Sequence, residues 1–280
     1  GTEHEFSYVI LDIKYPKVIW IQGLVDSWIK LETNYILRKK LLLERKVFKN
    51  NKYFITGGIK HIEETILQSN TNPIFIPLYY PIANKCFNIE KQQENADIVF
   101  VGRLTKLKGI EDLIEAVSII VKDRDELIVK IIGPVNERYK MYLLDLIKEK
   151  KIEKNINFIG YIEEHSEMLV EVKKSKIFVL PTYFDTGPRS VAEAMALGVP
   201  VISYQVDGLP SMIKNKETGI LVEKGNIPEL SKSILELLNN KDLYNEIASN
   251  AKEYAKENFH ANFIVKQLLN YYNNILERKL

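Results

Sequence analysis

Residues 176–203 read KIFVLPTYFDTGPRSVAEAMALGVPVIS and decide the fold class. Two apolar runs, KIFVL (176–180) and PVIS (200–203), stand on either side of a loop and a helix-forming segment at 188–197. Because these runs lack polar alternation, they are typical of strands buried on both faces of a sheet. A strand, a helix and a second strand in succession form the repeating unit of a parallel α/β sheet.

The same alternation of short apolar runs and longer amphipathic segments extends over most of the chain. Further strands are predicted at 97–101, 127–132, 156–159 and 219–222, and helices at 109–122, 136–150, 163–174, 208–214, 227–239, 241–257 and 262–277. This repetition predicts a doubly wound, Rossmann-like parallel sheet. Before it, strands are predicted at 18–22, 53–56 and 74–77 and helices near 28–49 and 59–68, which amounts to part of a second β/α domain.

The pattern divides the chain into four parts. These are a partial N-terminal Rossmann-like domain at 1–80, a polar linker at 81–96, a complete C-terminal Rossmann-like domain at 97–260 and a final helix at 261–280.

The composition excludes several classes of protein. The 280 residues include 39 basic and 37 acidic side chains and are 10% aromatic, so neither disorder nor a nucleic-acid partner is indicated. A single cysteine, Cys86, excludes an internal disulfide framework and fits a reducing compartment. No apolar run approaches the roughly 18 residues that a membrane span needs. We therefore expect a cytoplasmic protein.

The first candidate site is VFVGRLTKLKGI, residues 99–110. A predicted strand ends at Gly102, and Arg103 follows it directly. Lys108 stands just before a helix that is expected to start near Gly109. Two cations and a helix N-terminus thus meet at the carboxyl end of a strand, where open parallel sheets bind ligands and where phosphate groups are readily held. The alternative is a solvated basic turn, and the segment lacks the GxxxxGK[ST] pattern of a Walker loop.

The second candidate site is the loop and helix after the strand at 176–180. Asp185 lies in this loop, and Glu193 lies in the helix that Pro188 opens. The backbone N–H groups near 187–190 are expected to be available to an anion. The alternative, when the motif is considered alone, is that Asp185 is an ordinary loop carboxylate and Glu193 a solvated helix residue.

Five segments of the chain follow one another in a characteristic order. They are GRLTKLKGIEDLIEAV (102–117), IIGP (131–134), INFIGY (156–161), IFVLPTYFDTGPRSVAEAMALGVPVISYQVDGLPSMI (177–213) and TGILVEKGN (218–226). Together they resemble the retaining glycosyltransferases of family 4, which have the two-domain GT-B fold. The resemblance is strong over 97–240, moderate over the last helices and weak over 1–80.

The resemblance implies a nucleotide-diphosphate sugar as donor, carried on UDP, GDP or ADP, and no metal ion or other cofactor. Arg103 and Lys108 would hold the diphosphate, because cations stabilise the negative charge that develops on this leaving group. Asp185 would contact hydroxyls of the transferred sugar, and Glu193 would contact those of the ribose. The implied catalytic residues are Arg103, Lys108 and Asp185, and the implied donor-binding residues are Gly102, Arg103, Lys108, Gly133, Gly160, Tyr161, Asp185, Thr186, Gly187, Pro188, Arg189, Ser190 and Glu193.

The implied reaction is transfer of a hexosyl unit, with retention, to a saccharide or lipid-linked acceptor in bacterial surface polysaccharide or glycolipid assembly. Two alternatives stay open, a non-catalytic sugar-nucleotide-binding fragment and a sugar-nucleotide epimerase of the GT-B fold. The Asp123-Arg124-Asp125 triplet has the DxD form that metal-dependent sugar-transferring enzymes use. Because it precedes the strand at 127–132, it is expected at the amino end of the sheet, and we interpret it as a surface turn.

The chain departs from the family pattern at two places. The first acid of the E-x7-E motif is Asp185 and is one methylene shorter than glutamate, so either the loop compensates or the donor differs. No glycine-rich loop precedes Val18, so we expect the first part of the acceptor-binding N-terminal domain to be absent. In the family the final helix crosses back onto that domain, and packing on its own domain is the alternative.

The stretch at 28–52 carries eight basic and two acidic residues, with Leu, Ile and Trp interleaved. This pattern fits contact with an anionic membrane surface, and related enzymes take lipid-linked acceptors at the inner face of the membrane. The alternative is a domain helix with a solvated basic face.

Overall fold

The computed structural model describes residues 13–21, 23–25, 35–90 and 92–278. It divides into two compact units. The larger unit comprises Ile82–His260, and the smaller one combines the chain before Ile82 with the segment that starts at Ala261. None of the described helices is both long and apolar enough to cross a membrane.

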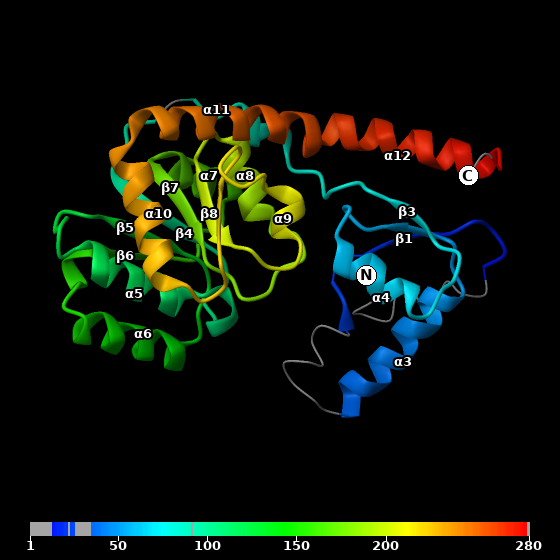
Figure 1. Ribbon diagram of the computed structural model, residues 1–280, viewed down its shortest axis with the longest axis horizontal. Coiled ribbons are helices and arrows are strands. Elements are labelled where there is room, and N and C mark those ends of the chain that lie inside the picture. Colours follow the sequence, from blue (N-terminus) through cyan, green and yellow to red (C-terminus); the bar gives the residue numbers. More distant parts are fainter. Residues whose placement is uncertain (1–12, 22, 26–34, 91, 279–280) are drawn as a thin grey trace. The chain divides into compact units, whose positions relative to one another are not determined.

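The larger unit is built on one parallel sheet (Figure 1). Its six strands are β4 (Ala96–Val101), β5 (Val129–Ile132), β6 (Ile156–Gly160), β7 (Ser175–Leu180), β8 (Val201–Tyr204) and β9 (Ile220–Val222). They are hydrogen-bonded in the order β6-β5-β4-β7-β8-β9. This order confirms the predicted doubly wound parallel sheet.

Helices follow these strands along the chain and cover the sheet. They are α5 (Ile110–Ile120), α6 (Glu137–Glu149), α7 (His165–Lys173), α8 (Arg189–Ala196), α9 (Leu209–Met212), α10 (Ile227–Asn239) and α11 (Lys241–Asn258). α10 packs on α5, whereas α11 packs on α8. The starts of α6, α10 and α11 are fixed by asparagines whose side chains accept a backbone N–H of the first turn, namely Asn136, Asn226 and Asn240.

The centre of the larger sheet explains why its strands read as unbroken apolar runs. Ile98 and Phe100 on β4, Val129 on β5 and Phe178 on β7 are fully buried. Burying one such side chain stabilises a fold by roughly 1.5–3 kcal/mol. Because these strands are buried, their ends and the loops that follow them can change position very little.

The expected linker at 81–96 is mostly folded onto the larger unit. Ile82 pairs with His260 in an isolated β-bridge, and the short helix η2 (Asn84–Phe87) follows. Ile82 and Cys86 are both buried, because their apolar side chains pack into this unit. Burial raises the pKa of the Cys86 thiol to about 11.

The smaller unit contains a second parallel sheet with strand order β1-β2-β3. Its elements are β1 (Val18–Trp20), α3 (Tyr35–Lys49), β2 (Tyr53–Ile55), α4 (Lys60–Leu67), β3 (Ile74–Ile76) and α12 (Ala261–Leu276). The part of the expected helix at 28–34 and the segment GTEHEF lie outside the described residues.

Helices cover both faces of this small sheet. Phe48 of α3 and Ile62 of α4 form one core with Phe54 of β2. Ile264 and Ile275 of α12 form a second core with Tyr53, Ile55 and Ile76, which alternate with the residues of the first core along the strands. The last helix therefore belongs to the smaller unit.

Candidate functional site

The carboxyl ends of β4 and β7 lie side by side at the centre of the larger sheet. The two strands are parallel neighbours, with Val99 beside Phe178. The chain moves outward from β4 through β5 to β6 and then outward from β7 through β8 to β9, so the strand order reverses between β4 and β7. Open α/β sheets bind their ligands at the carboxyl edge of such a reversal. Both predicted motifs follow these two strands and lie at this edge.

Two glycines allow the loops after the strands to approach each other closely. Gly109 has a φ of 71°, and a Cβ at this position would lie 1.8 Å from the carbonyl oxygen of Pro181. Gly133 has a φ of 143°, and a Cβ there would lie 1.9 Å from the carbonyl oxygen of Gly102. Since both obstacles are backbone atoms, any other residue at either position would force the backbone to shift.

Hydrogen bonds tie the turn after β4 to the loop after β7. This turn is the 3-10 helix η3 (Lys106–Lys108). The carbonyl oxygen of Leu107 accepts the backbone N–H of Tyr183 at 2.8 Å. The buried hydroxyl of Thr182 lies 3.0 Å from the same oxygen. Lys108 is therefore fixed relative to the loop that carries Asp185.

The predicted cation and the predicted acid meet directly at this edge. The Nζ atom of Lys108 forms an ion pair with Oδ2 of Asp185, and the two side chains are 23% and 13% exposed. Arg103 is exposed. No other described side chain forms an ion pair or hydrogen bond with its guanidinium. The site thus combines one paired and one open cation.

The backbone of Asp185 is held by the turn that follows β8. Its N–H donates to Oδ2 of Asp207 at 3.0 Å. Its carbonyl oxygen accepts the N–H of Gly208 at 3.1 Å. The N–H of Gly187 lies 3.4 Å from Oδ1 of Asp185, a weak contact within the loop. Asp207 was absent from the predicted site.

Glu193 is buried in α8 rather than solvated, with its side chain 6% exposed. Its Oε1 atom lies 3.0 Å from Nε2 of His165, the first residue of α7. The exposed guanidinium of Arg189 lies 3.4 Å from the same oxygen. A hydrogen bond to a carboxylate requires a donor, so Nε2 of His165 carries a proton in this arrangement. The sequence had indicated no role for His165.

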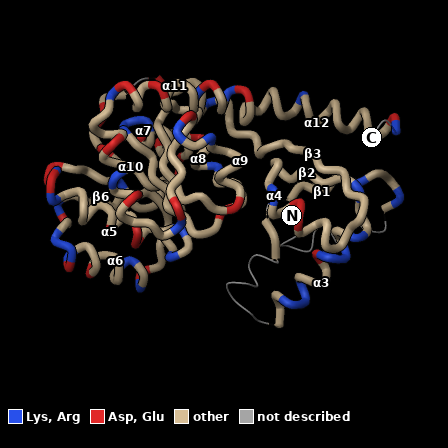
Figure 2. The backbone as a smooth tube through the Cα atoms, in the orientation of Figure 1, with Lys and Arg blue, Asp and Glu red and all other residues tan. Residues whose placement is uncertain are grey.

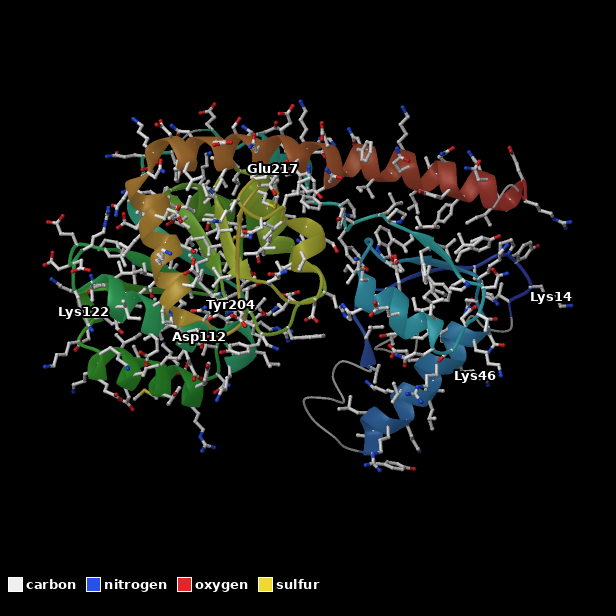
Figure 3. The ribbon with its side chains drawn as sticks, in the orientation of Figure 1. Lys14, Lys46, Asp112, Lys122, Tyr204 and Glu217 are labelled. Carbon is white, nitrogen blue, oxygen red and sulfur yellow. The ribbon has the colours of Figure 1, made fainter. Side chains whose placement is uncertain are left out.

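A carboxylate and two tyrosines, of which only Tyr204 is fully buried, form a second group beside the site. Asp112, in the first turn of α5, accepts hydrogen bonds at Oδ2 from Tyr183 at 2.7 Å and from Tyr204 at 2.6 Å. Figure 3 labels Asp112 and Tyr204. Burial and the bond to Asp112 raise the pKa of Tyr204, and the same causes raise the pKa of Tyr183 to about 12. Both phenols are therefore neutral donors at physiological pH.

The remaining predicted residues lie around the same edge. The amide N–H groups of Arg189 and Ser190, at the start of α8, have no hydrogen-bond partner among the described residues. Gly160 ends β6 with a φ of 82°, and Tyr161 after it is 69% exposed. The structure thus brings the predicted residues to the carboxyl edge of β4, β5, β6 and β7.

The Asp123-Arg124-Asp125 turn lies at the opposite edge, as the sequence predicted. It connects α5 to the start of β5, and Arg124 pairs with Asp97 at the start of β4 at 3.4 Å. Within the described part of the chain, no group of three or more His, Cys, Asp or Glu side chains is placed to hold a metal ion.

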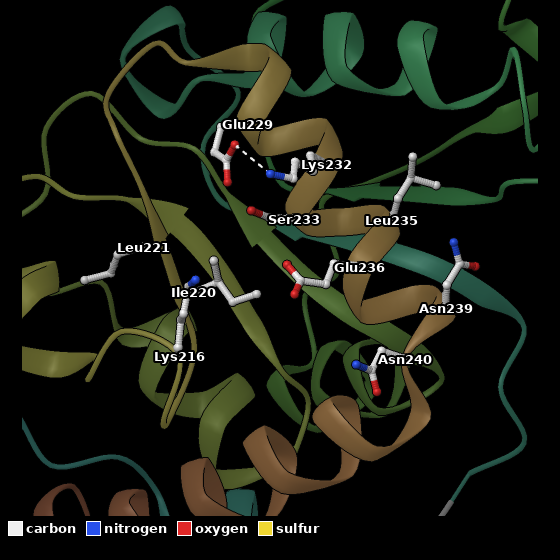
Figure 4. Close-up of a pocket in the computed structure, with 10 residues that line it drawn as sticks. All are labelled: Lys216, Ile220, Leu221, Glu229, Lys232, Ser233, Leu235, Glu236, Asn239 and Asn240. Carbon is white, nitrogen blue, oxygen red and sulfur yellow. Dashed lines mark ion pairs between the residues drawn. The ribbon is translucent and has the colours of Figure 1, made fainter.

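The larger unit also has a surface pocket of about 500 Å³, drawn in Figure 4. It lies between the end strand β9 and α10, and Glu229 and Lys232 on its rim form a long ion pair of 3.8 Å. None of the residues that line it is a predicted site residue.

Local sequence patterns did not reveal every residue at the edge. His165 and Glu193 are 28 positions apart and meet because α7 packs on α8. Asp207 stands in an Asp-Gly pair after a predicted strand, which signals a turn but not a partner. Asp112 is one of two acids in the first turn of α5, and the sequence does not distinguish it from Glu111.

Comparison with known proteins agrees with this geometry. The family model described as "Glycosyl transferases group 1" matches residues 82–254. An uncharacterized glycosyltransferase of Methanocaldococcus jannaschii is 27% identical over 98% of this chain and 71% of its own length. The capsular polysaccharide biosynthesis glycosyltransferase CapM of Staphylococcus aureus is 30% identical over 66% of this chain and 47% of its own length. The chain thus spans less than half the length of several curated relatives, CapM among them.

A solved structure shows the same fold at lower identity. Anabaena HepE in complex with UDP superimposes with a TM-score of 0.77 at 16% identity, over 96% of this chain and 75% of that one. The family match covers more than half of the chain, and the fold, the strand order and the position of the motifs agree with it. The chain belongs to the glycosyl transferases group 1 family.

Proposed function

We propose that this chain transfers a hexosyl unit from a nucleotide-diphosphate sugar to a saccharide or lipid-linked acceptor. One observation carries the proposal. Arg103 and Lys108 follow β4, Asp185 follows β7, and Lys108 forms an ion pair with Asp185 at the point where the strand order reverses. This is the edge at which an open parallel sheet binds a phosphorylated ligand.

In this reaction the residues have to stabilise a leaving group. The bond between the sugar carbon and the diphosphate oxygen breaks, a bond from that carbon to the acceptor oxygen forms, and the proton of the acceptor hydroxyl passes to the leaving diphosphate. Negative charge grows on the diphosphate as the bond breaks, and fixed cations lower the free energy of that state. In this proposal the Arg103 guanidinium, the Lys108 ammonium and the open N–H groups of Arg189 and Ser190 bind the diphosphate without a metal ion.

The acids and glycines bind the other parts of the donor. Asp185 faces the hydroxyls of the transferred sugar, and Glu193 faces those of the ribose. Gly133, Gly160 and Tyr161 line the side of the nucleotide, and residues 186–188 line the diphosphate and the sugar. Retention of configuration is part of the proposal by analogy with the family.

The proposed donor and pathway are based on the names of the similar proteins. HepE was solved with UDP, so a UDP-sugar is the first donor to test, ahead of GDP- and ADP-sugars. CapM is named for capsular polysaccharide biosynthesis, which supports a saccharide acceptor in bacterial surface polysaccharide assembly.

The exposed face of α3 supports a peripheral membrane contact at the cytoplasmic side. Figure 2 shows Lys and Arg along this helix. The face at i, i+3, i+4 and i+7 spacing exposes Tyr35, Arg38, Lys39, Leu42, Arg45, Lys46 and Lys49. Glu44 is buried and accepts the N–H of Val25 at 2.9 Å, so its carboxylate does not offset this face. Five cations with two apolar side chains fit an anionic lipid surface.

Vesicle flotation tests the membrane contact. The chain should float with vesicles of phosphatidylcholine and phosphatidylglycerol, but not with phosphatidylcholine alone, and salt should release it. The Arg45→Glu, Lys49→Glu double variant should lose this binding. The Lys241→Glu, Lys252→Glu double variant, which changes exposed cations of α11, serves as the control. Equal loss in both variants contradicts a role for α3.

Calorimetric titration in EDTA tests the donor site. We would titrate UDP, GDP, ADP and their common sugar conjugates into the chain and into Arg103→Ala. Losing a charge-assisted diphosphate contact should cost about 1.5–3 kcal/mol, which is roughly 10- to 150-fold in affinity. Lys122→Ala removes an exposed cation from the turn after α5 and should bind as the unchanged chain does.

The outcomes separate the proposed function from its alternatives. Binding of one nucleotide without metal, weakened only in Arg103→Ala, supports the donor site and identifies the base. Release of sugar from a labelled donor to water or an acceptor supports transfer, whereas binding without turnover supports a binding role. Absence of binding by the folded chain contradicts the proposal.

A further inference from the structure

Asp207 has a strained backbone next to the candidate site. Its φ is 43°, in the left-handed region that residues with a Cβ rarely adopt, although aspartate and asparagine adopt it more often than most. It is followed by Gly208, but that glycine has an ordinary φ of −85°. The strain thus falls on the aspartate although a glycine stands beside it. Strained positions of this kind persist where the surrounding structure requires them, and they gather at functional sites.

The Asp207-Gly208 turn holds the backbone of Asp185 on both sides. Oδ2 of Asp207 accepts the N–H of Asp185 at 3.0 Å. The N–H of Gly208 donates to the carbonyl oxygen of Asp185 at 3.1 Å. A glycine at position 207 would relieve the strain but would remove the carboxylate that holds this N–H.

The position of the Asp185 backbone decides where its carboxylate reaches. An aspartate side chain has only two torsions, so a fixed backbone confines its carboxylate to a small volume. This carboxylate is paired with Lys108 and partly exposed at the ligand edge. A short acidic side chain binds a sugar hydroxyl more tightly when its backbone is already fixed, because less conformational entropy is lost on binding.

We propose that Asp207 is a positioning residue that holds Asp185 against the transferred sugar. This inference rests on the proposed function, in which Asp185 contacts the sugar while Arg103, Lys108 and Glu193 hold the nucleoside diphosphate. Asp207 therefore determines how much more tightly the site binds a sugar nucleotide than the bare nucleoside diphosphate.

Substitution of Asp207 by glycine and by asparagine tests the role. UDP and UDP-glucose are titrated into each variant, together with the GDP–GDP-mannose and ADP–ADP-glucose pairs. Asp207→Gly should leave the affinity for the diphosphate within about twofold but weaken the sugar nucleotide about tenfold, the lower end for a lost hydrogen bond to a charged group. Asp207→Asn keeps an acceptor oxygen and tolerates the left-handed backbone, so it should recover most of the loss.

Thermal unfolding shows whether the variants act through stability alone. Lys151 also has a positive φ, of 57°, and stands in the turn after α6. Lys151→Gly is the matched control and should raise the melting temperature without changing either affinity. Asp207→Gly should not lower the melting temperature by more than a few degrees, because relief of strain offsets the lost hydrogen bond.

Each outcome of these titrations either supports or overturns the positioning role of Asp207. A lower ratio of the two affinities in Asp207→Gly, recovered in Asp207→Asn, supports the inference. Equal weakening of both ligands with a lower melting temperature shows a purely structural role and overturns it, as does an unchanged ratio. If the unchanged chain binds none of these ligands, the proposed function itself fails, which is a different result from binding with an unchanged ratio.

Discussion

Tyr204, at the end of β8, donates a hydrogen bond of 2.6 Å to Oδ2 of Asp112 in the first turn of α5. Tyr183, in the loop after β7, donates to the same oxygen at 2.7 Å. One carboxylate oxygen therefore links the helix after β4 to the chain after β7 and to the end of β8. These are the three connections that carry Lys108, Asp185 and Asp207. Asp112 also lies at a helix N-terminus, where the backbone dipoles stabilise its negative charge.

The hydrogen bond to Asp112 predicts the effect of removing one hydroxyl. Tyr204 is fully buried, and Tyr204→Phe preserves its ring but removes the donor. Hydrogen bonds to charged groups contribute roughly 1.5–3 kcal/mol, so the free energy of unfolding should fall by about that amount. Urea unfolding followed by circular dichroism measures it. Tyr142→Phe is the control, because Tyr142 is exposed and its hydroxyl lies 3.4 Å from Glu111. An equal loss in both variants would contradict the role of Asp112.

The same tyrosine predicts how stability depends on alkaline pH. Burial and the bond to Asp112 raise the pKa of Tyr204 above the ordinary value of 10.0. Below pH 10 the phenol is protonated in both the folded and the unfolded chain, so its contribution to stability is fully present. Above pH 10 the unfolded chain loses this proton and the folded chain keeps it, so stability falls as pH rises towards the folded pKa.

Urea unfolding between pH 8 and 11 checks this dependence. One group with a raised pKa contributes at most about 1.4 kcal/mol per pH unit to the loss above pH 10. Tyr183 has the same partner but is only partly buried, so solvent reduces its share. Stability should therefore fall less steeply above pH 10 in Tyr204→Phe than in the unchanged chain. The same steepness in both would show that Tyr204 ionises alike in the folded and unfolded states.

The central strands and the first pair of site residues were predictable from the sequence. Ile98 and Phe178 are fully buried within runs that have no polar interruption, so β4 and β7 end at the predicted residues, 101 and 180, and each begins one residue before its predicted start. Lys108 and Asp185 are 77 positions apart, yet a parallel sheet places the chain segments after two neighbouring strands together. The general rule for ligand sites in such sheets predicted that both segments lie at one edge, whereas the ion pair between the two side chains was not predicted.

The other contacts depend on packing that no local pattern encodes. Lys130 lies inside the apolar run of β5 and is buried, because Glu171 of α7 and Asn95 each lie 2.6 Å from its Nζ atom. The strand sequence shows neither partner. Likewise, the left-handed backbone of Asp207 depends on the loop after β7, and the contact between His165 and Glu193 depends on how two helices pack.

Gly133 and Gly160 both lie at strand ends, and replacing each by alanine should lower the stability by a different amount. Gly133→Ala would place a Cβ 1.9 Å from the carbonyl oxygen of Gly102, so the chain after β4 must move. Gly160→Ala has the left-handed backbone strain alone, because nothing lies within 4 Å of its Cβ. Gly160→Ala should therefore lose about 1–2 kcal/mol of stability. Gly133→Ala should lose more and should also weaken nucleotide binding.

Urea unfolding and nucleotide titration of the two glycine variants separate strain from displacement. If Gly133→Ala is no less stable than Gly160→Ala and binds nucleotide equally well, the close approach of Gly102 and Gly133 has no role in the site.

The contact between His165 and Glu193 predicts a change in the recognition of ribose. Glu193 is buried and contacts His165 through one oxygen, Oε1, which leaves Oε2 for the proposed contact with a ribose hydroxyl. His165→Ala leaves this carboxylate with Arg189, whose side chain is 64% exposed, as its nearest cation. The carboxylate should then change its position. We expect affinity for UDP to fall about tenfold, the lower end for a lost hydrogen bond to a charged group.

A ligand without the 2′-hydroxyl distinguishes this effect from a general loss of structure. Deoxyuridine diphosphate lacks a hydroxyl that Glu193 is proposed to bind, so its affinity should change less than that of UDP in His165→Ala. The preference for UDP over its deoxy form should shrink in this variant. His165→Gln places an amide N–H near the position of the ring Nε2–H, and it should restore much of the preference. If both ligands weaken equally and glutamine restores neither, His165 supports the packing of α7 and α8 but not the recognition of ribose.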